Sequence, residues 1–167
     1  RLIKDVEKHF EHLGGLEKII PENAKVVIKP NLVSGEKPEK AVTVHPDLVY
    51  AIVEVVKRRT SDITLAESPG GPHSDVRLKN IYKVTGLADI DCEKIYEPQV
   101  KEIEYPDGIR CKTFSVIKEI AEADVLISAA KLKTHGMMAY TGAVKNLFGA
   151  IFSLEKVEFH FRYNNRS

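Results

Sequence analysis

Three short apolar runs alternate with helical patterns along this chain, and this order restricts the fold more than any other feature. The runs, at 25–29, 62–67 and 124–128, have the length and composition of buried strands. Apolar residues at helical spacing lie between them, at 48–56 and 76–84. This order predicts a parallel sheet, because the connection between parallel strands must cross back along the sheet, usually through a helix.

A strong turn signal, Pro106-Asp107-Gly108, interrupts the alternation. Apolar and polar residues alternate on both sides of it, at 93–96, 100–104 and 109–114. We therefore predict a three-layer α/β fold. It should have a mainly parallel sheet with flanking helices and a small antiparallel hairpin insertion at about 93–114.

Other boundaries follow from turn residues and helical spacing. A helix over 2–13 is expected to stop at Gly14-Gly15, and another is expected over 46–59. A short helix over 116–123 would lead into the last strand. Residues 1–167 are expected to form a single domain of a longer protein, since the chain opens inside a helical pattern without an initiator Met.

The charge balance and the cysteines exclude several classes of function. The chain has 25 basic and 24 acidic residues, so there is no basic excess to attract nucleic acid. No apolar run approaches the roughly 20 residues of a membrane span, and no signal peptide is recognisable. Cys92 and Cys111 form no Cys-x-x-Cys pair, so they supply no zinc or iron–sulfur ligand set. We expect a cytoplasmic protein that binds neither nucleic acid nor membranes and has no metal site.

Polar residues follow each predicted strand at its carboxyl end. Lys29-Pro30-Asn31 follows the first strand, Glu67-Ser68-Pro69-Gly70-Gly71 the second, and Lys131-Leu132-Lys133-Thr134-His135 the third. Ligands of open parallel sheets bind at these ends. The three segments are therefore expected to meet, with Thr141–Gly149 just beyond, in one composite pocket for an anion.

The residue types suit an anion, although several have plainer alternatives. Lys131 and Lys133 would point to one face of an extended backbone, where two like charges need an anion or a carboxylate between them. Lys29 could simply be solvated, and Asn31 could only anchor its loop. Thr141 could cap the following helix, whose N-terminus would add backbone donors. The predicted ligand-binding residues are Lys29, Asn31, Lys131, Lys133, Thr134, Thr141, Lys145 and Asn146.

Glu67 and His135 are the candidate catalytic residues. A carboxylate and an imidazole titrate far apart, so the two could act as a proton-transfer pair with different roles. Glu67 could instead be a counter-ion for the lysines or accept a hydrogen bond from a ligand hydroxyl. His135 could instead serve as a plain hydrogen-bonding residue or, with His160 and Glu67, hold a metal ion.

Five segments of the chain form a recognisable combination: Lys29–Val33, Val42–Pro46, Ala66–Gly70, Lys131–His135 and Thr141–Gly149. Together they resemble the family catalogued as domain of unknown function 362, from about Leu13 to about Phe161. Many members are described as iron–sulfur centre proteins, because a ferredoxin-like domain accompanies this one. The resemblance therefore implies a redox-linked setting, with a 4Fe–4S cluster in a companion domain and none on this chain.

Two functions from different classes fit these residues. The first is a redox-linked, iron–sulfur-associated enzyme domain whose lysine-rich pocket binds an anionic small molecule. The alternative is a non-catalytic module that docks a ferredoxin-like domain or another acidic partner through its lysines. The residues leave open whether the chain is an enzyme, and the cofactor remains unknown.

Overall fold

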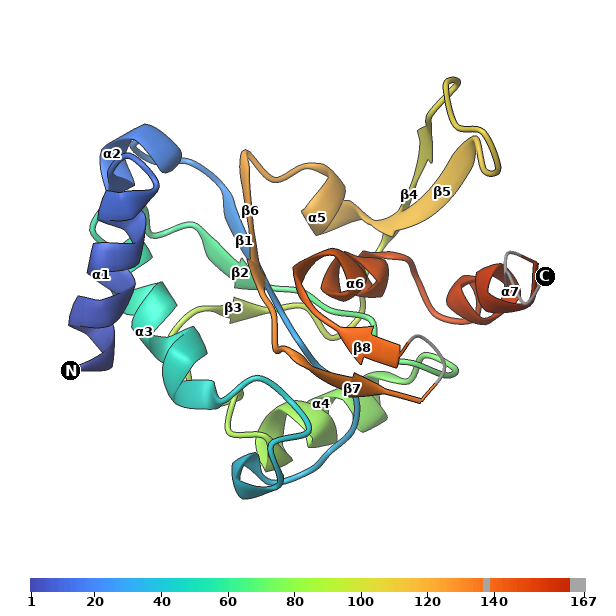
Figure 1. Cartoon of the computed structure of the whole chain (residues 1–167), viewed down its shortest axis with the longest axis horizontal. Helices are drawn as coiled ribbons and strands as arrows, with labels where there is room; N and C mark the ends of the chain where they lie inside the picture. Colours follow the sequence, from blue (N-terminus) through green and yellow to red (C-terminus); the bar gives the residue numbers. More distant parts are fainter. Residues whose placement is uncertain (137–138, 163–167) are drawn as a thin grey trace.

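A sheet of four parallel strands forms the centre of the computed structural model, which describes residues 1–136 and 139–162 (Figure 1). β1 (Val26–Pro30) and β2 (Ile63–Leu65) are the inner strands. β6 (Val125–Ala129) borders β1, and β3 (Glu93–Lys94) borders β2. All three pairings are parallel, which confirms the predicted α/β fold.

Helices cover both faces of this sheet. One face carries α1 (Leu2–His12), α3 (Pro46–Val56) and α4 (Asp75–Val84). The other carries α5 (Lys118–Ala121), α6 (Ala143–Leu147) and the 3-10 helix η2 (Phe148–Ala150). β1 shows the division, because Val26 and Ile28 belong to the first core and Val27 to the second. The three predicted layers are therefore present. The remaining short elements are α2 (Leu16–Ile19), η1 (Pro38–Lys40) and α7 (Glu155–Arg162).

The central strand β1 places a lysine inside the molecule. All five residues of β1 are buried, since the strand has a neighbour on each side and helices over both faces. Side chains alternate along a strand, so Lys29 lies on the same face as Val27, toward α6 and η2. Lysine is rarely buried unless it is paired, so this position requires a partner from the covering layer.

Cap residues set the ends of the flanking helices. The Ser74 Oγ accepts a hydrogen bond from the backbone N–H of Arg77 over 3.3 Å and begins α4. Pro46 is the first residue of α3, a position where its missing N–H costs nothing. Gly14 follows α1 with a φ of 107°, a conformation that favours glycine. α3 ends at Val56, somewhat earlier than predicted.

Two small antiparallel hairpins extend from the layered core. The first pairs β4 (Val100–Glu104) with β5 (Thr113–Ile117), as the Pro106-Asp107-Gly108 turn predicted. The second pairs β7 (Lys133–His135) with β8 (Ala139–Thr141) and was not anticipated from the sequence. The second hairpin follows β6 directly and lies at the carboxyl end of the sheet (Figure 1).

Two further boundaries differ from the predictions. Glu93–Lys94 pairs with β2 in the parallel sheet, so the antiparallel insertion begins later than residue 93. The predicted helix over 116–123 is shorter, since Val116 and Ile117 still pair with β4 and α5 begins at Lys118. At Glu93–Lys94 local alternation identified an extended segment without its partner, whereas at Val116 and Ile117 the pairing with β4 overrode the predicted helix; tertiary contacts decided both.

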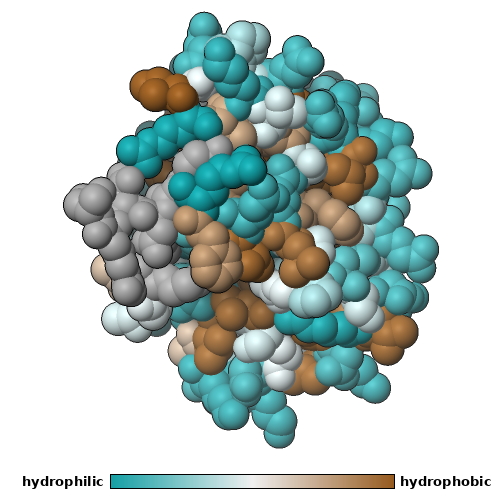
Figure 2. Space-filling view, turned by 90° about the vertical axis from the view of Figure 1, so that its right-hand side faces the viewer, coloured by the Kyte–Doolittle hydropathy of each residue, from teal (hydrophilic) through white to brown (hydrophobic). Residues whose placement is uncertain are grey.

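The end of the molecule that carries α7 and the β4–β5 hairpin has a mixed surface. Hydrophilic side chains surround hydrophobic ones that gather nearer its centre (Figure 2). Leu154, Val157 and Phe161, in or just before α7, are among the exposed apolar residues of the chain. This end therefore presents apolar as well as hydrophilic side chains at its surface.

Truncation of Ile28 should destabilise the fold strongly. Ile28 is 0% exposed in the centre of β1, whereas Ile109, in the β4–β5 turn, is 99% exposed. Ile28→Ala is expected to lower the free energy of unfolding by about 2–5 kcal/mol through lost burial and a residual cavity. Ile109→Ala should change it by less than about 0.5 kcal/mol. Chemical denaturation measures both, and equal losses in the two variants would contradict this core.

Candidate functional site

A cavity of about 730 Å³ lies at the carboxyl ends of the sheet strands. Its size is within the usual range for small-molecule sites, roughly 300–1,000 Å³. The loops after β1 and β2, the β7–β8 hairpin, α6 with η2, and α7 supply its walls. The polar residues that line it are Lys29, Asn31, Glu67, Ser68, Lys133, Thr134, His135, Thr141, Lys145, Asn146, Lys156 and His160.

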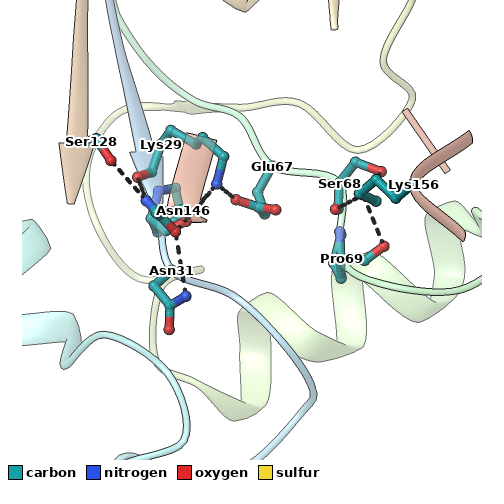
Figure 3. Close-up of polar contacts among 9 residues, drawn as sticks. Lys29, Asn31, Glu67, Ser68, Pro69, Ser128, Asn146 and Lys156 are labelled. Atoms are coloured by element: carbon teal, nitrogen blue, oxygen red, sulfur yellow. Dashed lines mark hydrogen bonds and ion pairs between the residues drawn. The ribbon is translucent and has the colours of Figure 1, made fainter. Parts of the chain in front are cut away.

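A buried ion pair forms the floor of this site. The Nζ of Lys29 donates to the Oε2 of Glu67, and the two side chains are 1% and 3% exposed. The two residues come from the ends of adjacent strands, β1 and β2 (Figure 3). Burial of two charges is costly in free energy, so the pair depends on its direct contact and on further hydrogen bonds around it.

Asn146 of α6 supplies those further hydrogen bonds. Its Oδ1 accepts from the Nζ of Lys29 over 3.4 Å and from the Nδ2 of Asn31 over 3.3 Å. Its Nδ2 donates to the backbone oxygen of Lys29 over 3.2 Å and to the Oγ of Ser128 over 3.0 Å (Figure 3). The amide therefore ties α6 to both β1 and β6, and its buried polar atoms all have partners.

Gly149 leaves room for the ion pair. A Cβ at this position would lie 2.7 Å from the Nζ of Lys29 and 2.7 Å from the Cδ of Glu67. The backbone oxygen of Gly149 also accepts from the N–H of Ser68 over 3.1 Å, which holds η2 close to the strand end. Glycine is needed here because the η2 backbone approaches the charged pair closely.

Two features of its environment have opposite effects on the pKa of Glu67. Burial raises the pKa of Glu67 above its usual value, while the ammonium groups of Lys29 and Lys156 oppose that rise. The effect of burial is the larger, because the carboxyl group is almost wholly removed from water, so the pKa of Glu67 is raised. A carboxyl group with a raised pKa is better matched to proton transfer near neutral pH than an exposed one.

Three further lysines surround the pair. Lys156 of α7 is 7% exposed, and its Nζ donates to the backbone oxygen of Ser68 and, over 2.9 Å, to the Ser68 Oγ. Burial lowers the pKa of Lys156 to about 8. Burial also lowers the pKa of Lys133 and of Lys145, and neighbouring lysines add to both effects. The cavity thus collects ammonium groups in places where their charge is poorly solvated.

Two histidines complete the lining. Burial lowers the pKa of His135, in β7, and of His160, in α7, and the ammonium of Lys145 lowers both further. The ring of His160 also meets that of Phe148 edge-on, with centroids 5.0 Å apart. Within residues 1–136 and 139–162, no group of three or more His, Cys, Asp or Glu side chains is arranged to hold a metal ion.

The cavity brings together nine of the ten residues singled out from the sequence. Lys131 is the exception: it precedes β7 and is not among the described residues that line the cavity. β7 begins at Lys133, so Lys131 precedes the strand, and the common face expected for the two lysines stays a prediction. Thr141 lines the cavity from the end of β8, but the expectation that it caps the next helix is wrong, since Gly142 occupies that position. Whether any of these residues binds a ligand stays a prediction.

Two polar lining residues, Ser68 and Lys156, were given no role in the sequence analysis. Ser68 follows Glu67 and its Oγ accepts from the backbone N–H of Ser153 over 2.9 Å, which joins the strand end to the segment before α7. Lys156 reaches the same serine from α7. The position of Lys156 depends on the packing of α7 back onto the sheet, so no local motif identified it.

The comparison with known families covers this whole site. The family described as "Domain of unknown function (DUF362)" matches residues 26–167, which include every residue that lines the cavity. The chain belongs to this family. The match extends over the four parallel strands and both hairpins.

The chain is also similar to one curated protein. The chain is 27% identical over 170 residues to the thylakoid-associated protein sll1697 of Synechocystis sp., an alignment that covers 95% of this chain and 49% of the relative. The chain therefore spans about half the length of that curated relative. No solved structure is significantly similar to the chain. Among the described residues, no helix combines the length and the apolar character that a membrane span requires.

Addition of a methyl group at Gly149 should disturb the ion pair. Gly149→Ala is expected to lower the free energy of unfolding by about 1–3 kcal/mol, because the Cβ would force Lys29 and Glu67 to move. Gly70→Ala is the matched control, since a Cβ there meets nothing within 4 Å. Thermal or chemical unfolding compares the two variants. A Gly149→Ala protein as stable as the control would show that the pair does not need this space.

The buried amine of Lys156 should make stability depend on alkaline pH. Its folded-state pKa of about 8 lies below the usual 10.5, so between these values the unfolded chain binds more protons than the folded one. The stability of the wild type should therefore rise with pH in this window relative to Lys156→Met, by on the order of 3 kcal/mol. Below the window the difference between the proteins should be constant. Denaturation curves across the pH range test this, and parallel curves would refute it.

Proposed function

We propose that this chain binds an anionic small molecule in the cavity at the strand ends. The observation that carries the proposal is an excess of positive charge. Lys133, Lys145 and Lys156 line the cavity, whereas the carboxylate of Glu67, the single acid among its described lining residues, is already paired with Lys29. An anion would supply the counter-charge that these partly desolvated ammonium groups lack.

Burial of the lysines favours a small ligand over a docked protein. Lys29 and Lys156 are almost wholly buried, so the surface of a partner protein could not reach their ammonium groups. The end of the molecule that carries α7 also exposes apolar side chains among hydrophilic ones (Figure 2), whereas a partner docked by charge is recognised mainly through charged groups. A non-catalytic docking module is therefore the weaker of the two functions considered.

The proposed ligand lies next to two groups able to move protons. Burial raises the pKa of Glu67 and lowers that of His135, so the two groups titrate closer together than the free side chains do. A smaller difference in pKa lowers the free-energy cost of passing a proton between the carboxyl group, the ligand and the imidazole. We propose Glu67 and His135 as the acid–base pair if the bound molecule reacts.

A redox-linked setting is the second part of the proposal. It rests on the resemblance to iron–sulfur-associated relatives, in which a companion ferredoxin-like domain or partner would carry a 4Fe–4S cluster. This chain would then bind the anionic substrate, and the companion would exchange electrons with it. The cytoplasmic location stays a prediction, because a thylakoid association is stated only for the Synechocystis relative.

Loss of Lys145 should weaken ligand binding. Isothermal titration calorimetry against a panel of phosphates and carboxylates should detect at least one ligand of the wild type. Lys145→Ala should lower its affinity by about tenfold, the usual cost of one charge-assisted contact. Lys8→Ala, an equal loss of charge on the exposed side of α1, is the control and should keep wild-type affinity.

Lys131→Ala tests whether the residues that line the cavity, rather than all the lysines proposed from the sequence, determine ligand binding. Since Lys131 does not line the cavity, its loss should weaken binding less than the loss of Lys145. No ligand for the wild type, or equal affinities of wild type and Lys145→Ala, would rule out the proposed function.

A further inference from the structure

We propose that the ligand is a phosphorylated small molecule, whose phosphate or diphosphate group lies against Lys133, Lys145, His135 and His160. This inference rests on the proposed anion-binding function and assigns the chemical class of the anion. It also assigns the part of the cavity that the anionic group occupies, which is distinct from the end that holds Glu67.

The first support is the amount of charge to be compensated. The cavity is lined by four lysines and one described carboxylate, so a surplus of three formal positive charges remains after the Lys29–Glu67 pair is formed. A monocarboxylate would compensate one of these charges. A phosphate monoester carries about −1.5 to −2 at neutral pH, and a diphosphate carries more. A phosphate group therefore matches the surplus better than a monocarboxylate does.

The second support is the central position of Lys145. Its ammonium lowers the pKa of Lys133, His135, His160 and Lys156, so it lies within electrostatic reach of all four. These groups come from β7 and α7, while Lys145 belongs to α6. An anion beside Lys145 would therefore meet basic groups from three separate elements, as a multiply charged phosphate group requires.

The third support is the uneven influence of Glu67. Its charge acts on the pKa of Lys145 and of Lys156. The pKa of Lys133 and of the two histidines is lowered by burial and by basic neighbours. A dianion beside these three lining groups would meet their positive charge, while the carboxylate of Glu67 is already paired with Lys29.

The remaining volume indicates an organic portion on the ligand. At about 730 Å³ the cavity is much larger than a bare phosphate ion, and part of its wall is apolar. Leu32, Val33 and Val157 contribute to that wall. A phosphorylated metabolite would place its carbon skeleton there and its reactive centre between Glu67 and His135, the proposed acid–base pair.

Binding of such a group should draw protons onto the histidines. His135 is faced by Lys133 of its own strand, Lys145 of α6 and His160 of α7, and His160 is faced by Lys145 and the ring of Phe148. Burial and these basic neighbours lower the pKa of both imidazoles, which favours their neutral form in the unliganded protein. A dianion beside them would reverse that balance and raise their proton affinity.

The test is isothermal titration calorimetry of the chain with inorganic diphosphate, inorganic phosphate and acetate at matched ionic strength. Diphosphate should bind at least about tenfold more tightly than acetate. Near neutral pH, its apparent binding enthalpy should differ between two buffers of different ionisation enthalpy, which reports proton uptake. Replacement of both His135 and His160 by Ala should abolish that difference. His9→Ala, on the exposed part of α1, should preserve it.

Other results of the titrations would overturn the phosphate assignment or both proposals. Acetate that binds as tightly as diphosphate, or diphosphate binding without proton uptake, would overturn the phosphate assignment and leave the anion-binding function standing. Failure of every anion in the panel to bind would remove both proposals. Lys133→Gln and Lys145→Gln variants that retain folded circular dichroism spectra and full diphosphate affinity would place the bound anion elsewhere and overturn the inference.

Discussion

Lys29 and Glu67 meet in an ion pair that is almost closed to water, on a central strand whose other residues are all apolar. A charge at such a position is tolerated only when its partner and its hydrogen bonds are in place, because the loss of one partner typically costs about 3–5 kcal/mol. The neighbouring structure meets this requirement closely. Asn146 adds the remaining hydrogen bonds, and the absence of a side chain at Gly149 lets η2 approach the pair.

The same pair explains why the cavity is electrostatically unbalanced. Because Lys29 already engages Glu67, that carboxylate is only partly available to Lys145 and Lys156, and the lysines repel one another in a space with little water. Burial is the main cause of the lowered pKa of Lys145 and Lys156, and the neighbouring lysines lower both further. The anion of the proposed function would relieve this repulsion.

Much of the fold was predictable because local patterns and global topology agree. The apolar runs at β1, β2 and β6 and the amphipathic α3 and α4 required a parallel sheet with helices on both faces, although β6, at the edge of the sheet, is buried only at Ala129. The predicted element boundaries were wrong where contacts distant in sequence determine which strand a segment pairs with. Glu93–Lys94 joined β2 rather than the hairpin, and Val116-Ile117 extended a strand rather than starting a helix. Alternation of apolar residues gives the conformation of a strand but not its neighbour.

The residues of the candidate site also fall into a predictable and an unpredictable group. Residues that directly follow a buried strand, such as Lys29, Asn31 and Glu67, could be assigned to one region from chain order alone, because parallel strands end at the same edge of their sheet. Lys131 lay outside the cavity and Lys156 lay within it because loop conformation and the return of α7 place these side chains, and both depend on contacts distant in sequence. Chain order thus located the site, and tertiary packing selected the lysines that line it.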